Sequence, residues 1–207
     1  MNNELHVSIE KYLKILTSKS LDNSAFNSDY ELPVCAKLKD FLLMASEPFE
    51  RTHLAGHVTG SACILTPALD KVLLTHHKKL QKWIQLGGHS DGDPSTSGVA
   101  LKEAIEESGL SELAFFPWET IAGNPSETPV PFDFDIHEIP ELGNDPRHLH
   151  YDVRYVFVAR EPEKIALSDE SMDLKWFSLE EANLLCKETS MQRQFAKIRL
   201  FRNSIKP

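Results

Sequence analysis

Residues 86–110, LGGHSDGDPSTSGVALKEAIEESGL, constrain the fold of this chain more than any other segment. The paired glycines after an apolar run predict a strand that ends in a tight turn, because glycine lets the backbone approach a neighbour closely. The spacing then predicts a helix over about residues 95–108, with Leu101 and Ile105 on its buried side. Gly109 suits the position that follows a helix C-terminus. The segment therefore predicts a strand, a turn and an amphipathic helix.

Three glutamates, called the helix glutamates below, share one side of this predicted helix: Glu103, Glu106 and Glu107. Like charges at this spacing, in a last turn that prefers cations, oppose folding by roughly 1–2 kcal/mol. A magnesium ion held by carboxylates and by substrate phosphates would remove this cost. The alternative is a solvated acidic face. A calcium loop starting at Asp91 is disfavoured, because Thr96 and Lys102 stand where glycine and glutamate are needed.

The overall charge restricts the partners of the chain. A formal net charge of −9 argues against a nucleic-acid duplex, whose phosphates need a basic face. Three distant cysteines, Cys35, Cys63 and Cys186, favour reduced thiols in a cytoplasmic protein. No apolar run approaches the roughly 20 residues of a membrane span, and the first residues do not resemble a signal peptide. We therefore expect a cytoplasmic protein with no membrane contact and a small-molecule ligand.

The order of patterns along the chain predicts an α/β protein. Helical spacing over about residues 4–17 and 34–45 predicts a helical extension over residues 1–50 that packs on a main domain over residues 51–207. Strand patterns follow in HVTGSACILT, KVLLTHH, KWIQLGG, PFDFDIHEI and HLHYDVRYVFVAR, and two helices end the chain. Strands interleaved with a few helices predict an α/β or α+β sandwich.

The turn and the acidic helix resemble the Nudix box. This motif is a glycine, five residues, a glutamate, seven residues, and then R-E-U-x-E-E-x-G-U, where U is bulky and apolar. Counted from Gly88, residues 102–110 (KEAIEESGL) fall in this register. Three positions depart from the motif: Pro94 replaces the first glutamate, Lys102 replaces the arginine, and Leu86 replaces a proline common before the glycine pair. Asp91 and Asp93 offer substitute carboxylates, although neither is in register.

The resemblance, which extends over about residues 57–179, implies a Nudix-type α/β/α sandwich with a mixed β-sheet, preceded by the helical extension. It implies a hydrolase of phosphorus-containing acid anhydrides that cleaves the diphosphate linkage of a nucleoside diphosphate derivative, with Mg²⁺ or Mn²⁺. The helix glutamates would hold the metal with the Gly87 carbonyl, and Glu103 and Glu107 would be catalytic. Glu170 matches a position where some family members add a catalytic carboxylate.

Two alternatives stay open beside the hydrolase. One is a Nudix-like domain that binds a nucleotide or metabolite without hydrolysis, which the changes at Pro94 and Lys102 allow. The other is isomerase chemistry on an isoprenoid diphosphate, which the intact helix glutamates disfavour. The partner is expected to be a small diphosphate-containing substrate, and a homodimer is the assembly to test.

The pattern around residue 150 provides candidate substrate contacts. Strand alternation places four polar residues on one side and an apolar set on the other. The polar side either lines a substrate pocket or faces solvent. A metal-binding role for its histidines is a minor alternative. The candidate substrate contacts are these four and the histidine beside the glycine pair: His148, His150, Asp152, Arg154 and His89.

Overall fold

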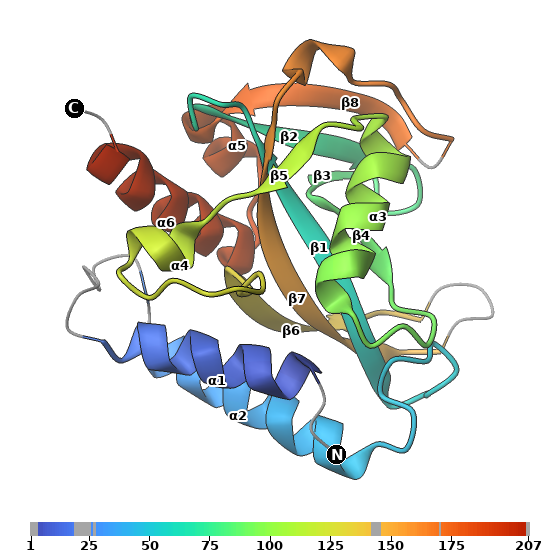
Figure 1. The fold of residues 1–207 in the computed structure, drawn as a ribbon. Helices are drawn as coiled ribbons and strands as arrows, with labels where there is room; N and C mark the ends of the chain where they lie inside the picture. Colours follow the sequence, from blue (N-terminus) through green and yellow to red (C-terminus); the bar gives the residue numbers. More distant parts are fainter. Residues whose placement is uncertain (1–3, 19–25, 27, 142–145, 170, 206–207) are drawn as a thin grey trace.

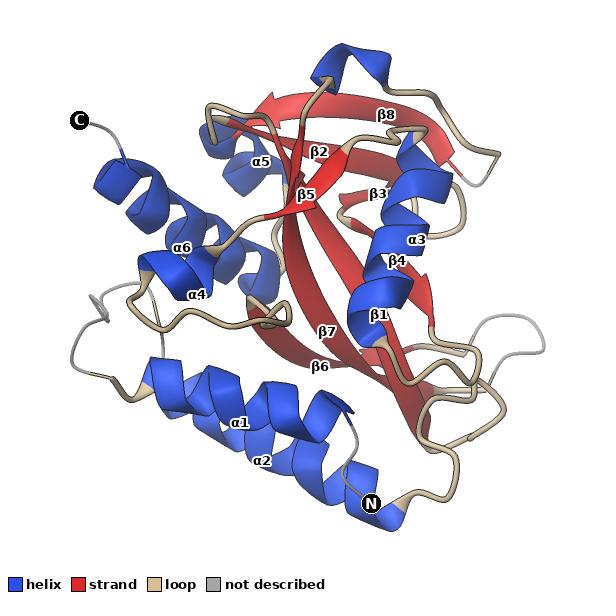
Figure 2. Ribbon diagram, viewed as in Figure 1, coloured by secondary structure: helices blue, strands red, loops and turns tan. Residues whose placement is uncertain are grey.

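The computed structural model describes residues 4–18, 26, 28–141, 146–169 and 171–205. Helices cover both sides of one eight-stranded sheet (Figures 1 and 2). In chain order the elements are α1 (Glu4–Leu16), α2 (Ser28–Met44), β1 (Gly56–Leu65), β2 (Lys71–His77), β3 (Lys82–Ile84), β4 (Leu86–His89), α3 (Thr96–Ser108), β5 (Leu113–Phe115), α4 (Trp118–Ile121), β6 (Asp133–Ile139), β7 (His148–Ala159), the 3₁₀ helix η1 (Pro162–Lys164), β8 (Ser171–Ser178), α5 (Leu179–Leu185) and α6 (Thr189–Ile205).

The sheet is mixed, as predicted. β1 runs parallel to β7 from Gly56, paired with Leu149, to Leu65, paired with Val158. The other pairs are antiparallel: β1 with β2 and β4, β2 with β3 and β8, and β7 with β5 and β6. A parallel pair needs a long crossover, and the chain between β1 and β7 includes the helix α3. All ten residues of β1 are buried, so both sides of this strand are covered.

The helices α3 and α6 lie on opposite sides of the sheet (Figure 1). A β-carbon at Gly60 would lie 2.8 Å from the Thr96 carbonyl oxygen, so this side of β1 touches α3. On the other side, Gln194 of α6 donates to Gln85, which in turn donates to Asp152 of β7. Helix, sheet and helix therefore form the three layers of the predicted sandwich.

The helix α3 buries a different set of residues from the one predicted. Ile105 is 38% exposed, so its prediction as a buried residue is wrong, while Leu101 is half-buried. Small residues allow α3 to approach β1 at Gly60, and Glu107 takes a position on the buried side. The buried residues of α3 are Thr96, Val99, Ala100, Ala104, Glu107 and Ser108. The helix ends as predicted, with Gly109 in the left-handed conformation at φ 71°.

The first helices share a core with the rest of the protein. The α1 helix follows its predicted range, whereas α2 begins at Ser28, six residues before the predicted start. Pro33 lies inside α2 as its sixth residue, where it cannot donate the backbone hydrogen bond to residue 29. Tyr12 of α1 donates to Glu31 of α2 at 2.5 Å, and Lys197 of α6 donates to Tyr12 at 2.9 Å. The division at residue 50 stays a prediction.

Two further expectations concern the environment of the chain. Cys35, Cys63 and Cys186 are free and buried, as expected of reduced thiols. Within the described ranges, no helix is both long and apolar enough to cross a bilayer.

Candidate active site

The paired glycines of β4 lie directly against the acidic side of α3. A β-carbon at Gly88 would lie 2.6 Å from the carboxyl carbon of Glu103 and 2.7 Å from one of its oxygens. A β-carbon this close would push the carboxylate, the end of a flexible side chain, away from its present position, so glycine at residue 88 lets Glu103 lie against the turn. The glycine pair therefore places the edge of the sheet against a helix glutamate.

Glu107 contacts the same turn from the last part of the helix. It is 9% exposed, and the Gly87 amide donates to its Oε1 at 3.3 Å. An acid in the last helical turn is opposed by the helix dipole, and a burial this deep adds a desolvation cost. The backbone donor from β4 offsets part of both effects.

Lys102 links the other two helix glutamates. Its Nζ lies 3.7 Å from Oε1 of Glu103 and 3.6 Å from Oε2 of Glu106. The Glu106 side chain is 58% exposed, whereas that of Glu103 is 16% exposed. Lys102 thus provides the positive charge that the arginine of the Nudix box would provide, without the planar fork of a guanidinium.

The residues present fit a hard divalent cation. The helix glutamates provide carboxylate oxygens, and the glycine pair leaves the neighbouring backbone without side chains. Magnesium and manganese prefer such oxygen ligands. The close approach of Gly88 to Glu103 is the feature of this structure that favours a ligand at the turn. Lys102 forms ion pairs with Glu103 and Glu106, whereas Glu107 accepts a hydrogen bond from the Gly87 amide. The three carboxylates therefore do not form one tight group.

The acidic loop before α3 does not add a carboxylate to this site. Asp91 forms a two-point ion pair with Arg51 at 2.5 Å, and the Arg51 guanidinium lowers the pKa of Asp91. Asp93 accepts the Ser95 amide at 2.8 Å, which orders the start of α3. Neither contact involves a helix glutamate. A substitute for the carboxylate that Pro94 replaces is therefore not positioned here by Asp91 or Asp93.

The predicted substrate histidines belong to a tight group on the other side of the sheet. Within the described parts of the chain, this group alone brings three or more His, Cys, Asp or Glu ligand atoms to within 4.8 Å of one another. Paired residues on neighbouring strands share a side, so its members lie on the side of Thr59 and Ser61, away from α3. The group, called the histidine cluster below, is His57, His89, His148 and His150.

Asp152 and Arg154 occupy the same side, but in the protein interior. The Arg154 side chain is 4% exposed and donates to Asp152 at 2.7 Å and to Asp135 at 3.1 Å. Thr59 and Ser61 also donate to Asp152. The alternative of a solvent-facing strand is wrong for these two residues, because each is 4% exposed. Their role as substrate contacts stays a prediction.

Sequence reasoning missed His57 as a member of the cluster. It is 2% exposed and pairs across the parallel strands with His150. The available signal was the alternation of His57, Thr59 and Ser61 in an otherwise apolar strand. Glu170, predicted as an accessory carboxylate, lies outside the described residues.

Comparison with known proteins identifies the domain. A family model described as the NUDIX domain matches residues 56–198. A NUDIX-family hydrolase from Clostridium perfringens is 23% identical, with 70% of this chain and 97% of that chain covered at a TM-score of 0.49. A binary complex of a C. elegans Ap4A hydrolase is 16% identical, with 72% and 98% covered at a TM-score of 0.53. No curated protein sequence matches the chain.

The family match spans the features on which the resemblance depends. It begins at the first residue of β1 and ends within α6, so it includes the glycine turn and the helix glutamates. The likeness to the Ap4A hydrolase supports the same fold. The predicted α/β/α sandwich with a mixed sheet is confirmed, and the chain belongs to the Nudix family.

Proposed function

We propose that this protein is a Nudix hydrolase that uses Mg²⁺ or Mn²⁺ to cleave the diphosphate linkage of a nucleoside diphosphate derivative. The observation that carries the proposal is the contact of the glycine turn with two helix glutamates, Gly88 with Glu103 and Gly87 with Glu107. In a family of hydrolases, carboxylates held at this spacing against a turn are suited to bind the divalent cation.

The roles of the residues follow from their positions. Glu106 and Glu107 are assigned as metal ligands, with the Gly87 carbonyl as a further ligand. Glu103 is assigned to metal binding or to activation of the attacking water. A divalent cation supplies neutralisation of phosphate oxygens and a lowered pKa of bound water. Lys102 lies near one oxygen of Glu103 and one of Glu106, so the second oxygen of each carboxylate takes no part in this contact.

An open cavity of about 620 Å³ supports a nucleotide as the substrate. It lies between α2 and the strands β6 and β7, where the rings of Phe41 and Tyr151 stack at 3.9 Å. Tyr151 pairs with Val58, and Gly88 pairs with Gly60, on the α3 side of β1. Two residues of a strand span about 7 Å, so the aromatic cavity lies within a nucleotide's length of the glycine turn. Base stacking on these rings is the contact we assign to the cavity.

The test is hydrolysis with magnesium or manganese over a panel of nucleoside triphosphates, nucleotide sugars, ADP-ribose and dinucleoside polyphosphates. We expect turnover of at least one compound and near-complete loss in Glu107→Gln. Glu112→Gln is the matched control, because Glu112 is an exposed acid just after α3. Full activity in Glu107→Gln would refute the assigned metal site.

The alternatives predict other outcomes of the same panel. A Nudix-like binding domain would show tight binding of one compound without turnover. An isomerase would convert an isoprenoid diphosphate without releasing phosphate or pyrophosphate. A cytoplasmic location and a homodimer remain predictions. So do the substrate contacts of His89, His148, His150, Asp152 and Arg154.

A further inference from the structure

The histidine cluster is assembled by neighbouring strands rather than by one segment. His57 of β1 and His150 of β7 are direct partners in the parallel pair. His89 of β4 pairs with Thr59, two residues along β1. His148 precedes His150 by two residues and so shares its side of the sheet. Three strands thus direct four imidazole rings toward one point.

The spacing within the cluster matches a tetrahedral metal site. One ring nitrogen from each histidine lies within 4.8 Å of the others, and the Nε2 atoms of His148 and His150 are 3.2 Å apart. Four nitrogens at the usual Zn–N distance of about 2.0–2.1 Å are about 3.3–3.4 Å apart. The closest pair already has this separation, and the widest needs to close by about 1.5 Å at most. Side-chain rotation alone provides such a movement.

His57 is a buried polar side chain whose ring nitrogens make no hydrogen bond of standard geometry to a described residue. The backbone of His53 interacts with the ring at longer range. Its ring instead lies 4.9 Å, between centroids, from each of the rings of His89, His148 and His150. A buried polar group left unsatisfied typically costs about 1–3 kcal/mol, so such groups are rare. A ligand among the four rings removes this cost.

The orientation of His148 suits a metal. Nδ1 of His148 lies 2.8 Å from the Pro146 carbonyl oxygen and donates to it, so the lone pair is on Nε2, which faces Nε2 of His150 inside the cluster.

We propose that the histidine cluster binds one Zn²⁺ ion. Four imidazole nitrogens select zinc or a related transition metal, whereas the carboxylates beside Gly88 select magnesium or manganese. The two sites lie on opposite sides of the sheet, and the bound zinc ties β1, β4 and β7 together next to the glycine turn. Four protein ligands close the coordination sphere, so the ion is structural.

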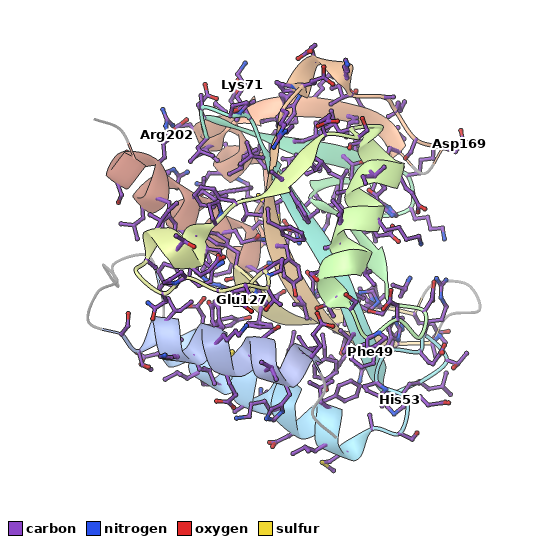
Figure 3. All side chains as sticks on the ribbon, viewed as in Figure 1. Phe49, His53, Lys71, Glu127, Asp169 and Arg202 are labelled. Carbon is purple, nitrogen blue, oxygen red and sulfur yellow. The ribbon has the colours of Figure 1, made fainter. Side chains whose placement is uncertain are left out.

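The cluster lies at the end of the sheet where β1 begins. Figure 3 places His53, four residues before His57, at this end, far from Lys71 at the start of β2. His137 on β6 is the next histidine along the sheet, opposite His150, but its Nδ1 contacts Asp135 at 3.1 Å. His137 is therefore not a member of the cluster, although its ring lies 5.5 Å from that of His150.

The experiment is a Zn²⁺ titration of the full chain after chelator treatment, against a chromophoric competitor, with Co²⁺ as a spectroscopic probe. We expect one zinc per chain and Co²⁺ absorption bands typical of four-coordinate nitrogen ligation. Changing a residue that only hydrogen-bonds to a metal ligand typically lowers metal affinity by about 10- to 100-fold. Because His57 is itself a proposed ligand, His57→Ala is expected to lower zinc affinity by at least about 100-fold. His89→Ala, at a half-buried position, is the second variant and leaves less of a cavity.

Two controls separate this site from the others. His76→Ala removes a half-buried histidine of β2 outside the cluster and is expected to leave zinc affinity unchanged. The double variant Glu103→Gln with Glu107→Gln tests the carboxylates and is also expected to keep it. Circular dichroism verifies that each variant is folded. Zinc affinity that is absent in the wild type, survives both cluster variants, or disappears in the glutamate variant overturns the proposal.

Discussion

Gly88 and Glu103 are fitted to each other so closely that a β-carbon at residue 88 would lie 2.6 Å from the Glu103 carboxyl carbon. Gly88 does not have a positive φ, so the close approach of the Glu103 carboxylate, and not the backbone conformation, is what favours glycine there. This contact is the most direct link between the turn and the helix glutamates.

Gly88→Ala is therefore expected to displace the Glu103 carboxylate and lower kcat by roughly 100-fold, the scale of effect of a 1 Å misplacement. The measurement is steady-state kinetics with the best substrate of the panel. Gly98→Ala is the matched control: Gly98 is exposed in α3, where alanine favours the helix by up to about 1 kcal/mol. Equal kinetics in wild type and Gly88→Ala would contradict the role of the contact.

Lys102→Arg restores the residue typical of the Nudix box, and Lys102→Met removes the charge. An exposed ion pair contributes about 0.2–1 kcal/mol, so we expect each change to alter kcat/KM by about five-fold or less, upward for arginine and downward for methionine. The change in kcat/KM is measured at several magnesium concentrations, because Lys102 competes with a cation for Glu103 and Glu106. A rise in Lys102→Met would show that the lysine opposes metal binding.

The sequence was most informative where the chemistry is local. The glycine turn, the helix glutamates and Gly109 lie within one short segment, so their relation is fixed by helix geometry and by the spacing of the Nudix box. Strand alternation likewise placed His148, His150, Asp152 and Arg154 on one side of β7. The confirmed α/β/α fold follows from these patterns together.

The rest depends on contacts between distant segments. The histidine cluster needs the parallel register that pairs His57 with His150, and no local pattern specifies that register. Arg154 is buried among Asp133 and Asp135 of β6, which also pair with Arg193 of α6, far along the chain. The exposure of Ile105 arises because α3 turns Glu107 toward the Gly87 amide.

The orientation of α3 can be tested by two alanine substitutions. Val99 is 3% exposed, so Val99→Ala is expected to cost about 1.5–3 kcal/mol of unfolding free energy through lost burial and a cavity. Ile105 is 38% exposed, so Ile105→Ala is expected to cost less than about 1 kcal/mol, because alanine also favours the helix. Urea unfolding measures both. A larger loss at Ile105 would restore the orientation expected from the sequence.

Lys197 is the buried charge that joins α6 to the N-terminal helices. Its side chain is 0% exposed, and its Nζ contacts Glu31 and donates to Asp133 at 2.6 Å. Removing one partner of a buried ion pair costs about 3–5 kcal/mol, which we expect for Lys197→Met in urea unfolding. The exposed Lys187 provides the control variant, Lys187→Met, with little expected change. A loss below 1 kcal/mol for Lys197→Met would mean that the neighbouring cations compensate.

Asp133 gives this network a defined pH dependence. Lys197 and Arg193 are the chief causes that lower its pKa, against the opposing effect of burial. The folded protein therefore binds fewer protons than the unfolded chain once the pH falls below the usual carboxyl value of about 3.9, and stability falls with pH there. Burial raises the pKa of Glu31, so Glu31 changes the stability in the opposite direction as the pH falls. The contribution of Asp133 is therefore isolated by comparing wild type with a variant at residue 133. The groups that face Asp133 are Tyr12, Glu31, Arg154, Arg193 and Lys197.

We expect Asp133→Asn to lower the unfolding free energy by a constant amount from pH 7 to about pH 5, because the carboxylate is ionised in both states over this range. The difference from wild type should shrink as the pH falls below about 4, where the unfolded carboxyl is protonated first and the contribution of the ionised group is lost. Urea unfolding at half-unit steps of pH from 7 to 3 measures the two curves. Asp40→Asn, at an exposed position of α2, is the control for a general loss of negative charge. Curves for wild type and Asp133→Asn that stay parallel to pH 3 would show that Asp133 is not held ionised by Lys197 and Arg193.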